Sequence, residues 1–136
     1  MARTLRLQIV TPQGTAYAED VELVTLPGVE GQMGVYPDHV RLTTQMVPGE
    51  IIVRKDNHDT FLAVGGGLVS VRNDSVDILT DMAVAAESID EAKAEEARQR
   101  AAARLREKLS AEEVASVNAS LARSLAQLHV KRRQHR

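Results

Sequence analysis

Glycine, proline and aromatic residues are confined to the first half of this 136-residue chain, and none of them occurs after Gly67. Because glycine and proline mark turns and interrupt helices, the first part is expected to contain short strands and the second part uninterrupted helix. The change in character falls near residues 82–88. We therefore predict two domains, residues 1–87 and residues 88–136.

Alternation of apolar and polar residues recurs along the first domain. It is clear in six segments, residues 5–10, 21–26, 50–55, 60–64, 68–72 and 75–79, which are separated by turn residues such as Pro-Gly and Asn-Asp. Short alternating strands, broken roughly every eight to twelve residues by turns, are typical of a β-sandwich or a flattened barrel. The spacing predicts about nine strands in an all-β N-terminal domain.

The second domain has a helical period. One stripe comprises Val114, Val117, Leu121, Leu125 and Leu128, and an earlier stripe comprises Ala97, Ala101, Leu105 and Leu109. Both spacings place apolar residues on one face of a helix. Each segment also begins with a Ser-x-x-Glu capping box, Ser88–Glu91 and Ser110–Glu113. We predict an antiparallel α-helical hairpin.

The first helical stripe is mostly alanine, which buries little apolar area per residue. Two interpretations follow from this. The hairpin is either an element that can open or detach, or a static pair of closely packed helices. Cleavage by a protease near the break at residues 108–110 would distinguish them.

Several classes of chemistry are excluded by the residue types. The chain contains no cysteine, and its four histidines are not at metal-ligand spacing. No nucleophile elbow or HExxH motif is present, and Gly65–Gly67 is not followed by the lysine of a phosphate loop. We therefore predict no catalytic residues, no metal ligands and no enzyme activity, and we interpret the triple glycine as a bulge or a close approach of backbone.

Charge is distributed unevenly between the two domains. Residues 1–87 contain 6 Lys and Arg against 12 Asp and Glu, whereas residues 88–136 contain 11 against 7. Such a split favours two modules with different partners. Nucleic acid is not expected, because the basic part lacks aromatic residues for base stacking. The start does not resemble a signal peptide, and no segment approaches the roughly 20 apolar residues of a membrane span.

Two local features invite a functional interpretation. In "GQMGVYPDHV", residues 31–40, Asp38 precedes His39, yet adjacent strand residues point to opposite faces and no nucleophile accompanies them. A tight corner near Pro37 is the alternative. At the other end of the chain, "LHVKRRQHR" is either a solvated basic helix end or a docking site for an acidic partner.

Three segments resemble one known family. "LPGVEGQMGVYPDHVRLTTQMVPG" is similar to the motif of epsilon subunits of F-type ATP synthases, in which a strand leads into a Gly-Glu-x-Gly stretch, a Pro-Gly-His and a later Pro-Gly. "FLAVGGGLVSVRNDSVDILTD" resembles the family's later strand pair. "SIDEAKAEEARQRAAARL" resembles the opening of its C-terminal helix. The resemblance extends over nearly the whole chain in the same order.

This resemblance implies a ten-stranded β-sandwich followed by a helical hairpin. It implies a non-catalytic rotor subunit of the central stalk that couples proton or sodium flow to ATP synthesis. The implied partners are the gamma subunit, the c-ring and, through an extended hairpin, the alpha/beta catalytic head, whose ATP hydrolysis the hairpin inhibits. The implied location is peripheral, on the cytoplasmic face of the bacterial plasma membrane.

Site residues are also implied by the resemblance. Contact with the c-ring falls on Gln32, Gly34 and His39, although Gln32 replaces a frequent glutamate, Asp38 replaces a glycine and Arg41 replaces a proline. Inhibitory contact with the beta subunits falls on Arg123, Lys131, Arg132 and Arg133.

Regulatory ATP binding in some bacterial members implies one further set of residues, Ile89, Asp90, Lys93, Arg100 and Arg123. Lys93 replaces an arginine and lacks its bidentate fork. Val84 and Gln127 stand where a glutamate and another arginine occur. No cofactor is required, and any ATP binding is expected to be weak. The alternative function for the chain is a non-catalytic β-sandwich binding module with a helical adaptor tail.

Overall fold

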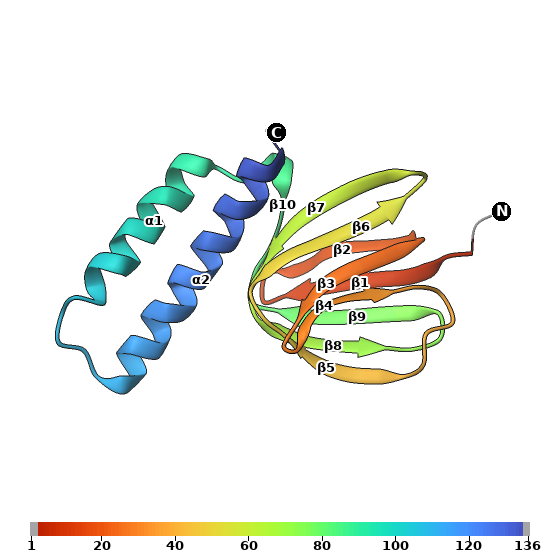
Figure 1. Cartoon of the computed structure of the whole chain (residues 1–136), viewed down its shortest axis with the longest axis horizontal. Helices are drawn as coiled ribbons and strands as arrows, with labels where there is room; N and C mark the ends of the chain where they lie inside the picture. Colours follow the sequence, from red (N-terminus) through yellow and green to blue (C-terminus); the bar gives the residue numbers. More distant parts are fainter. Residues whose placement is uncertain (1–2, 135–136) are drawn as a thin grey trace.

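The computed structural model describes residues 3–134, which form a nearly closed β-sandwich followed by a helical hairpin (Figure 1). The strands are β1 (Leu5–Thr11), β2 (Gly14–Val21), β3 (Leu23–Gly28), β4 (Gly31–Val35), β5 (Leu42–Met46), β6 (Gly49–Lys55), β7 (His58–Val64), β8 (Gly67–Val71), β9 (Ser75–Thr80) and β10 (Ala83–Ala85). A 3₁₀ turn, η1 (Ala86–Ser88), leads into α1 (Glu91–Arg104) and α2 (Ala111–Gln134). The predicted fold class is confirmed, with ten strands where the spacing of turns predicted about nine.

The sandwich is one continuous sheet that folds over on itself. Its strand order is β10-β7-β6-β3-β5-β8-β9-β1-β2, and β4 pairs with β3 off this path. Pairing is antiparallel throughout, except between β1 and β9. β3 and β5 meet at a single register pair, Gly28 with Met46, so this position joins the two layers.

Inward-facing residues of both layers form the main core. In β1, Leu5, Leu7 and Ile9 are buried while Arg6 is exposed, which is the alternation expected of a half-buried strand. The core consists entirely of side chains between Leu5 and Ile78, and aliphatic residues predominate in it. The hairpin contributes none of its sixteen members.

A second, smaller apolar cluster joins the hairpin to the outside of the sandwich. Its buried members are Ala63, Ala86, Ile89, Ala126 and Val130, and Phe61, Met82 and Val84 pack at its edge. α2 contacts β6, β7 and η1, whereas α1 packs mainly on α2 and lies on its outer side (Figure 1). We call this arrangement, with α2 against the sandwich, the docked hairpin. Neither helix in the described part of the chain combines the length and apolar character needed to cross a bilayer.

One of the two predicted capping boxes is present. The Glu113 amide donates to Ser110 Oγ at 3.2 Å, and the Ser110 amide donates to Glu113 Oε1 at 3.3 Å. The first box is wrong, because α1 begins at Glu91 and Asp90 caps it by accepting from the Lys93 amide at 3.1 Å. Ser88 lies in η1 instead, where Ala86 packs into the second cluster.

The predicted helical stripes are only partly buried. Val117 and Leu128 are buried, whereas Leu125 is 47% exposed. In the C-terminal half of α2 the buried residues include Ser124, Ala126 and Val130, because this half touches the sandwich on one side and α1 on the other. The earlier stripe also extends past its helix, since α1 ends at Arg104.

The interpretation of the triple glycine is confirmed. A Cβ atom on Gly67 would lie 1.9 Å from the carbonyl oxygen of Leu79 on β9, the residue before its register partner Thr80. Only a residue without a side chain allows this approach.

Candidate functional site

β4 and the loop that follows it carry the residues predicted to contact a rotor ring. Gln32 and Gly34 lie on β4 opposite Pro27 and Thr25 of β3, and both are exposed. His39 lies beyond the end of β4 and is half-buried. Three residues of extended strand, about 10 Å, separate Gln32 from the end of β4. Gln32 and His39 therefore lie toward opposite ends of the strand rather than in one cluster.

Asp38 and His39 do not form a catalytic pair. The Asp38 carboxylate pairs with Arg3, and its backbone amide donates to the carbonyl of Asn73 at 2.6 Å. His39 Nδ1 lies 2.7 Å from the carbonyl oxygen of Val40. Asp38 has φ of 68°, the left-handed region that glycine adopts most easily, which accounts for glycine at the matching position of the resembled motif. The segment is a constrained corner.

Apolar side chains project from the same corner. Val40 is 74% exposed, Tyr36 is also largely exposed, and Leu42 at the start of β5 is partly so. Grouped exposed apolar residues mark surfaces that contact other proteins. The corner is therefore suited to a protein partner.

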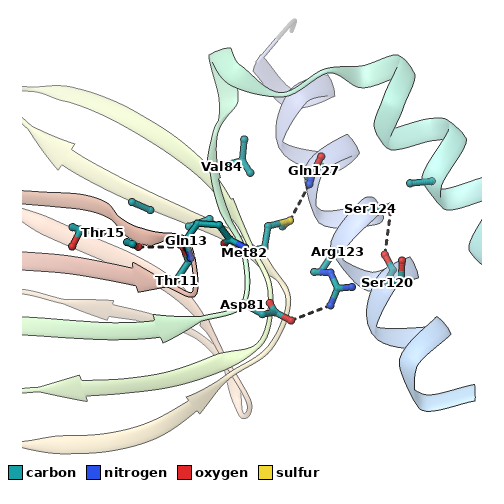
Figure 2. A pocket seen from close by; sticks show the side chains of 14 residues that line it. Thr11, Gln13, Thr15, Asp81, Met82, Val84, Ser120, Arg123, Ser124 and Gln127 are labelled. Carbon is teal, nitrogen blue, oxygen red and sulfur yellow. Dashed lines mark hydrogen bonds and ion pairs between the residues drawn. The ribbon is translucent and has the colours of Figure 1, made fainter. Parts of the chain in front are cut away.

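A cleft of about 570 Å³ separates α2 from the edge of the sandwich near β10 (Figure 2). Arg123 Nη1 lies 3.0 Å from Asp81 Oδ2 across it, and Gln127 Nε2 approaches the sulfur of Met82 at 2.9 Å. Val84 also lines it. Arg123 is thus the one cationic side chain that lines this cleft in the described part of the chain, and it is already paired with a carboxylate.

A smaller cleft of about 350 Å³ lies between the two helices. Arg100 and Arg104 of α1 and Arg123 of α2 line it, together with small residues such as Ser116 and Ser120. Arg104 also approaches Glu113 at 3.6 Å. Three guanidinium groups around one cleft attract an anion by charge.

The residues predicted to bind ATP fall into two groups. Arg100 and Arg123 line the same cleft. Ile89, however, is buried in the second apolar cluster, and Asp90 caps α1. Lys93 is exposed one turn further along α1. Ten residues of helix separate Asp90 from Arg100, about 15 Å along the axis. The structure therefore brings together the two arginines and not the other three residues.

Two of the predicted inhibitory side chains bind the edge of the sandwich. Arg123 pairs with Asp81, as described, and Lys131 Nζ donates to the carbonyl of Ala86 at 3.3 Å. The two contacts connect α2 to the two sides of β10, at Asp81 before it and Ala86 after it.

Arg132 connects the two helices. Its Nε donates to Glu91 Oε1 at 3.0 Å and its Nη2 to Glu95 Oε2 at 3.3 Å. The Arg98 guanidinium also donates to the Glu95 carboxylate, and this hydrogen bond, with those from its other neighbours, lowers the pKa of Glu95. The α1–α2 contact thus includes a small charge network.

Arg133 reaches back to the sandwich. It pairs with Glu50 of β6, and its guanidinium lies 5.3 Å from the centroid of the Phe61 ring on β7. All four predicted side chains are therefore engaged within the docked hairpin. His135 and Arg136 of the basic end lie outside the described residues.

Asp81, Glu50 and Phe61 were not identified from the sequence. Each lies on a strand or at a strand end, where a polar or aromatic residue on the outer face is ordinary. No local signal distinguishes them, because their partners lie far along the chain. Among residues 3–134, no group of three histidine, aspartate or glutamate side chains is placed to hold a metal ion.

Both parts of the chain match known protein families. Residues 4–86 match the ATP synthase delta/epsilon chain beta-sandwich domain, and residues 87–132 match the ATP synthase delta/epsilon chain long alpha-helix domain. Both describe one class of protein, the delta/epsilon chains of ATP synthases.

Individual relatives agree with this class. The chain is 40% identical over 134 residues to an ATP synthase epsilon chain of Dehalococcoides mccartyi, with 96% of each chain covered. It is 34% identical to that of Laribacter hongkongensis, over 97% of this chain and 99% of the relative. The chain belongs to the ATP synthase delta/epsilon family, as an epsilon subunit of the F-type enzyme.

Solved structures show the same fold. A chain in the Euglena gracilis mitochondrial ATP synthase, solved with its c-ring, has a TM-score of 0.77 and 26% identity, covering 93% of this chain and 79% of that one. A chain in the Tetrahymena thermophila mitochondrial ATP synthase central stalk and c-ring has a TM-score of 0.53 at 15% identity, over 62% of this chain and 69% of that one, which supports the fold alone.

Proposed function

We propose that this epsilon subunit turns with the gamma subunit on the c-ring and regulates ATP hydrolysis through its C-terminal hairpin. The regulatory part of this proposal rests on the contacts that the four basic side chains make within the protein. Arg123, Lys131, Arg132 and Arg133 are all engaged within the docked hairpin. While these contacts last, the same groups are not available to a partner.

Three of the five buried members of the cluster that holds the hairpin are alanine. Ala63 and Ala86 of the sandwich side meet Ala126 of α2, with Val130 beside them. Alanine contributes much less burial free energy than leucine would at the same positions. Such an interface permits reversible release, which favours the movable hairpin over a static one.

Release would expose the basic side chains to acidic segments of the beta subunits in the catalytic head. Arginine forms charge-assisted hydrogen bonds with carboxylates, so a carboxylate of a partner can replace an internal one. The extended hairpin would then exchange internal ion pairs for intermolecular ones. Hydrolysis is inhibited in that state.

The corner after β4 supports the rotor contact. His39 lies in this corner, the other predicted contact residues Gln32 and Gly34 lie on β4, and the exposed apolar side chains of Tyr36 and Val40 extend the surface. Gln32 and His39 lie toward opposite ends of β4. We therefore propose that they contact different subunits, one of them the c-ring and the other the gamma subunit. Since the chain has no cysteine, single variants Gln32→Cys and His39→Cys provide a clean crosslinking test. Crosslinking of both to the same subunit would contradict the division.

The subunit has no chemistry of its own in this proposal. It transmits rotation driven by protons or sodium ions, and it is peripheral to the cytoplasmic face of the membrane as part of the complex. This role requires no catalytic residue.

ATP binding to the hairpin is proposed to be weak. Arg100 and Arg123 attract phosphates, but Arg123 is already paired with Asp81, and Val84 and Gln127 provide no charge. Isothermal titration of the isolated protein should show at most weak binding of ATP. Tight binding would contradict the proposal, and no heat at millimolar ATP would exclude a regulatory site.

Deletion of residues 88–136 tests the central proposal. The truncated subunit should still assemble, because the main core ends at Ile78, and the assembled complex should hydrolyse ATP faster than the wild type. The matched control is the full-length complex prepared in parallel. Normal assembly with unchanged ATPase activity would contradict the regulatory role, whereas loss of assembly would assign the hairpin a structural one.

A further inference from the structure

A carboxylate lies in an unusual place under α2. Glu50 is the second residue of β6, and its cross-strand partner is Ala63, a buried member of the cluster that contacts Ala126 and Val130. Its side chain is only 8% exposed. An acidic side chain on the outer face of a sheet is ordinarily solvated, so its burial here results from the helix above it.

Only half of this carboxylate is satisfied by the described residues. Oε1 accepts from Arg133 Nη1, whereas Oε2 is buried and accepts no hydrogen bond from any residue between 3 and 134. Arg133 also stands over the ring of Phe61 on the adjacent strand. The guanidinium supplies the charge partner of Glu50.

Glu50 and Arg133 have opposite effects on the docking of α2. A buried charge is costly unless it is paired, and an unsatisfied oxygen adds to that cost. Glu50 therefore opposes docking of α2, because both of its oxygens regain water when the helix leaves. Arg133 is 47% exposed, so it keeps water contact in either state and offsets the cost only while docked.

The pair between Arg123 and Asp81 provides a contrast on the same helix. The Asp81 side chain is 48% exposed, so water can replace the arginine if the pair breaks. Exposed pairs of this kind contribute little to stability. The two pairs are therefore expected to respond very differently when the arginine is removed.

We propose that Glu50 makes docking of the hairpin conditional on Arg133, so that loss of this one guanidinium releases α2 from the sandwich. The consequence for regulation rests on the proposed function. A partner carboxylate that captures Arg133 leaves Glu50 buried without a counter-charge, and the docked state is then no longer favoured.

A single introduced cysteine can measure release directly, because the chain has none of its own. Ala126→Cys places a thiol in the buried interface between α2 and the sandwich. A water-soluble thiol reagent reaches it only when α2 undocks. The labelling rate of the isolated full chain then reports the opening equilibrium, even when the docked state predominates.

Four variants on this background form the test. Arg133→Met should raise the labelling rate roughly tenfold or more, whereas the control Arg123→Met should raise it by less than about threefold. Glu50→Met should leave the rate unchanged or lower it, because an apolar side chain of similar size suits the site. The double variant Glu50→Met with Arg133→Met should return close to the starting rate.

This recovery separates release from simple loss of packing or misfolding. Equal effects of Arg133→Met and Arg123→Met would overturn the proposal, as would a double variant that labels as fast as Arg133→Met alone. The ATPase of the truncated complex is an independent measurement. If deletion leaves the ATPase unchanged while labelling follows the expected pattern, the hairpin has no regulatory role but Glu50 still makes docking depend on Arg133. If deletion activates the ATPase while the labelling pattern is absent, the hairpin is regulatory but its docking does not depend on Glu50 and Arg133.

Discussion

Neighbouring glycines in this molecule differ in whether the structure leaves space for a side chain. Gly65, Gly66 and Gly67 are consecutive, yet a Cβ atom would meet different surroundings at each. At Gly67 it would strike the Leu79 carbonyl, a backbone atom that cannot move without disturbing β9. At Gly66 the nearest atom is the Met46 carbonyl oxygen at 3.5 Å, an ordinary contact.

Gly67→Ala should therefore destabilise the sandwich by about 1–3 kcal/mol, the usual cost of overpacking. Gly66→Ala is the matched control and should cost less than about 1 kcal/mol. Urea unfolding of the two variants measures the difference. Equal free energies of unfolding would show that β8 and β9 can separate to admit the methyl group.

The carboxylate of Glu95 allows a prediction about how stability depends on pH. The hydrogen bond from Arg98, with help from Gln99 and Arg132, holds the pKa of Glu95 below its ordinary value of 4.5. A carboxylate with a lowered folded-state pKa contributes stability that is complete above the unfolded-state value and is lost as pH falls through the folded-state value.

Glu95→Gln should thus lower the melting temperature of the helices at neutral pH, and the difference from wild type should vanish in acid. Glu96→Gln is the control, because Glu96 is exposed and takes part in no ion pair among the described residues. Thermal melts followed by helical circular dichroism across the acid range test this. A difference that persists in acid would assign the effect to helix propensity instead.

The start of each helix shows how local contacts define an element. α2 begins with a reciprocal capping box between Ser110 and Glu113, whereas α1 uses Asp90 although Ser88 offers the same motif. The motif is identical in both places. Its use at Ser88 is prevented because η1 continues from β10 and places Ala86 and Ile89 in the interface with α2.

Ser110→Ala should destabilise the first turn of α2 by about 1 kcal/mol, the typical value of a lost N-cap. Ser88→Ala should have little effect, since its hydroxyl caps no helix in the structure. Hydrogen exchange of the amides in the first turn of each helix measures both. Equal protection in the two variants would contradict this assignment of the caps.

The two domains differ in how much each depends on the other. The sandwich contains its complete core between Leu5 and Ile78. The hairpin has two helices of 14 and 24 residues, and many of its buried positions are alanine. Most of the stability of helices in proteins comes from tertiary packing, and a helix as short as α1 is marginal in water by itself.

Residues 1–87 alone should therefore retain β-structure and unfold cooperatively. Residues 88–136 alone should show only partial helix, with melting that lacks a sharp transition. Circular dichroism of the two fragments, compared with the full chain, is the measurement. A hairpin that melts cooperatively by itself would contradict a role for the sandwich in stabilising it.

Much of the fold follows from patterns between neighbouring residues. The six alternating segments all lie in observed strands or at their ends, and the change of period near residues 82–88 coincides with the passage from β10 to α1. Periodicity is sufficient here because strand and helix faces depend on residues two to four positions apart. The same reasoning failed for Leu125, because α2 contacts two neighbours and its buried surface is wider than one stripe.

The functional contacts depend on tertiary structure. Basic residues could be picked out along the chain, but not the groups that hold them. Arg133 is 83 residues from Glu50, and Arg123 is 42 residues from Asp81. Composition and periodicity limited the chain to a sandwich with a helical hairpin, since local sequence controls backbone conformation. Only the packing of α2 on β6 and β7 buries Glu50, because burial is a property of what lies above a residue and not of its neighbours in sequence.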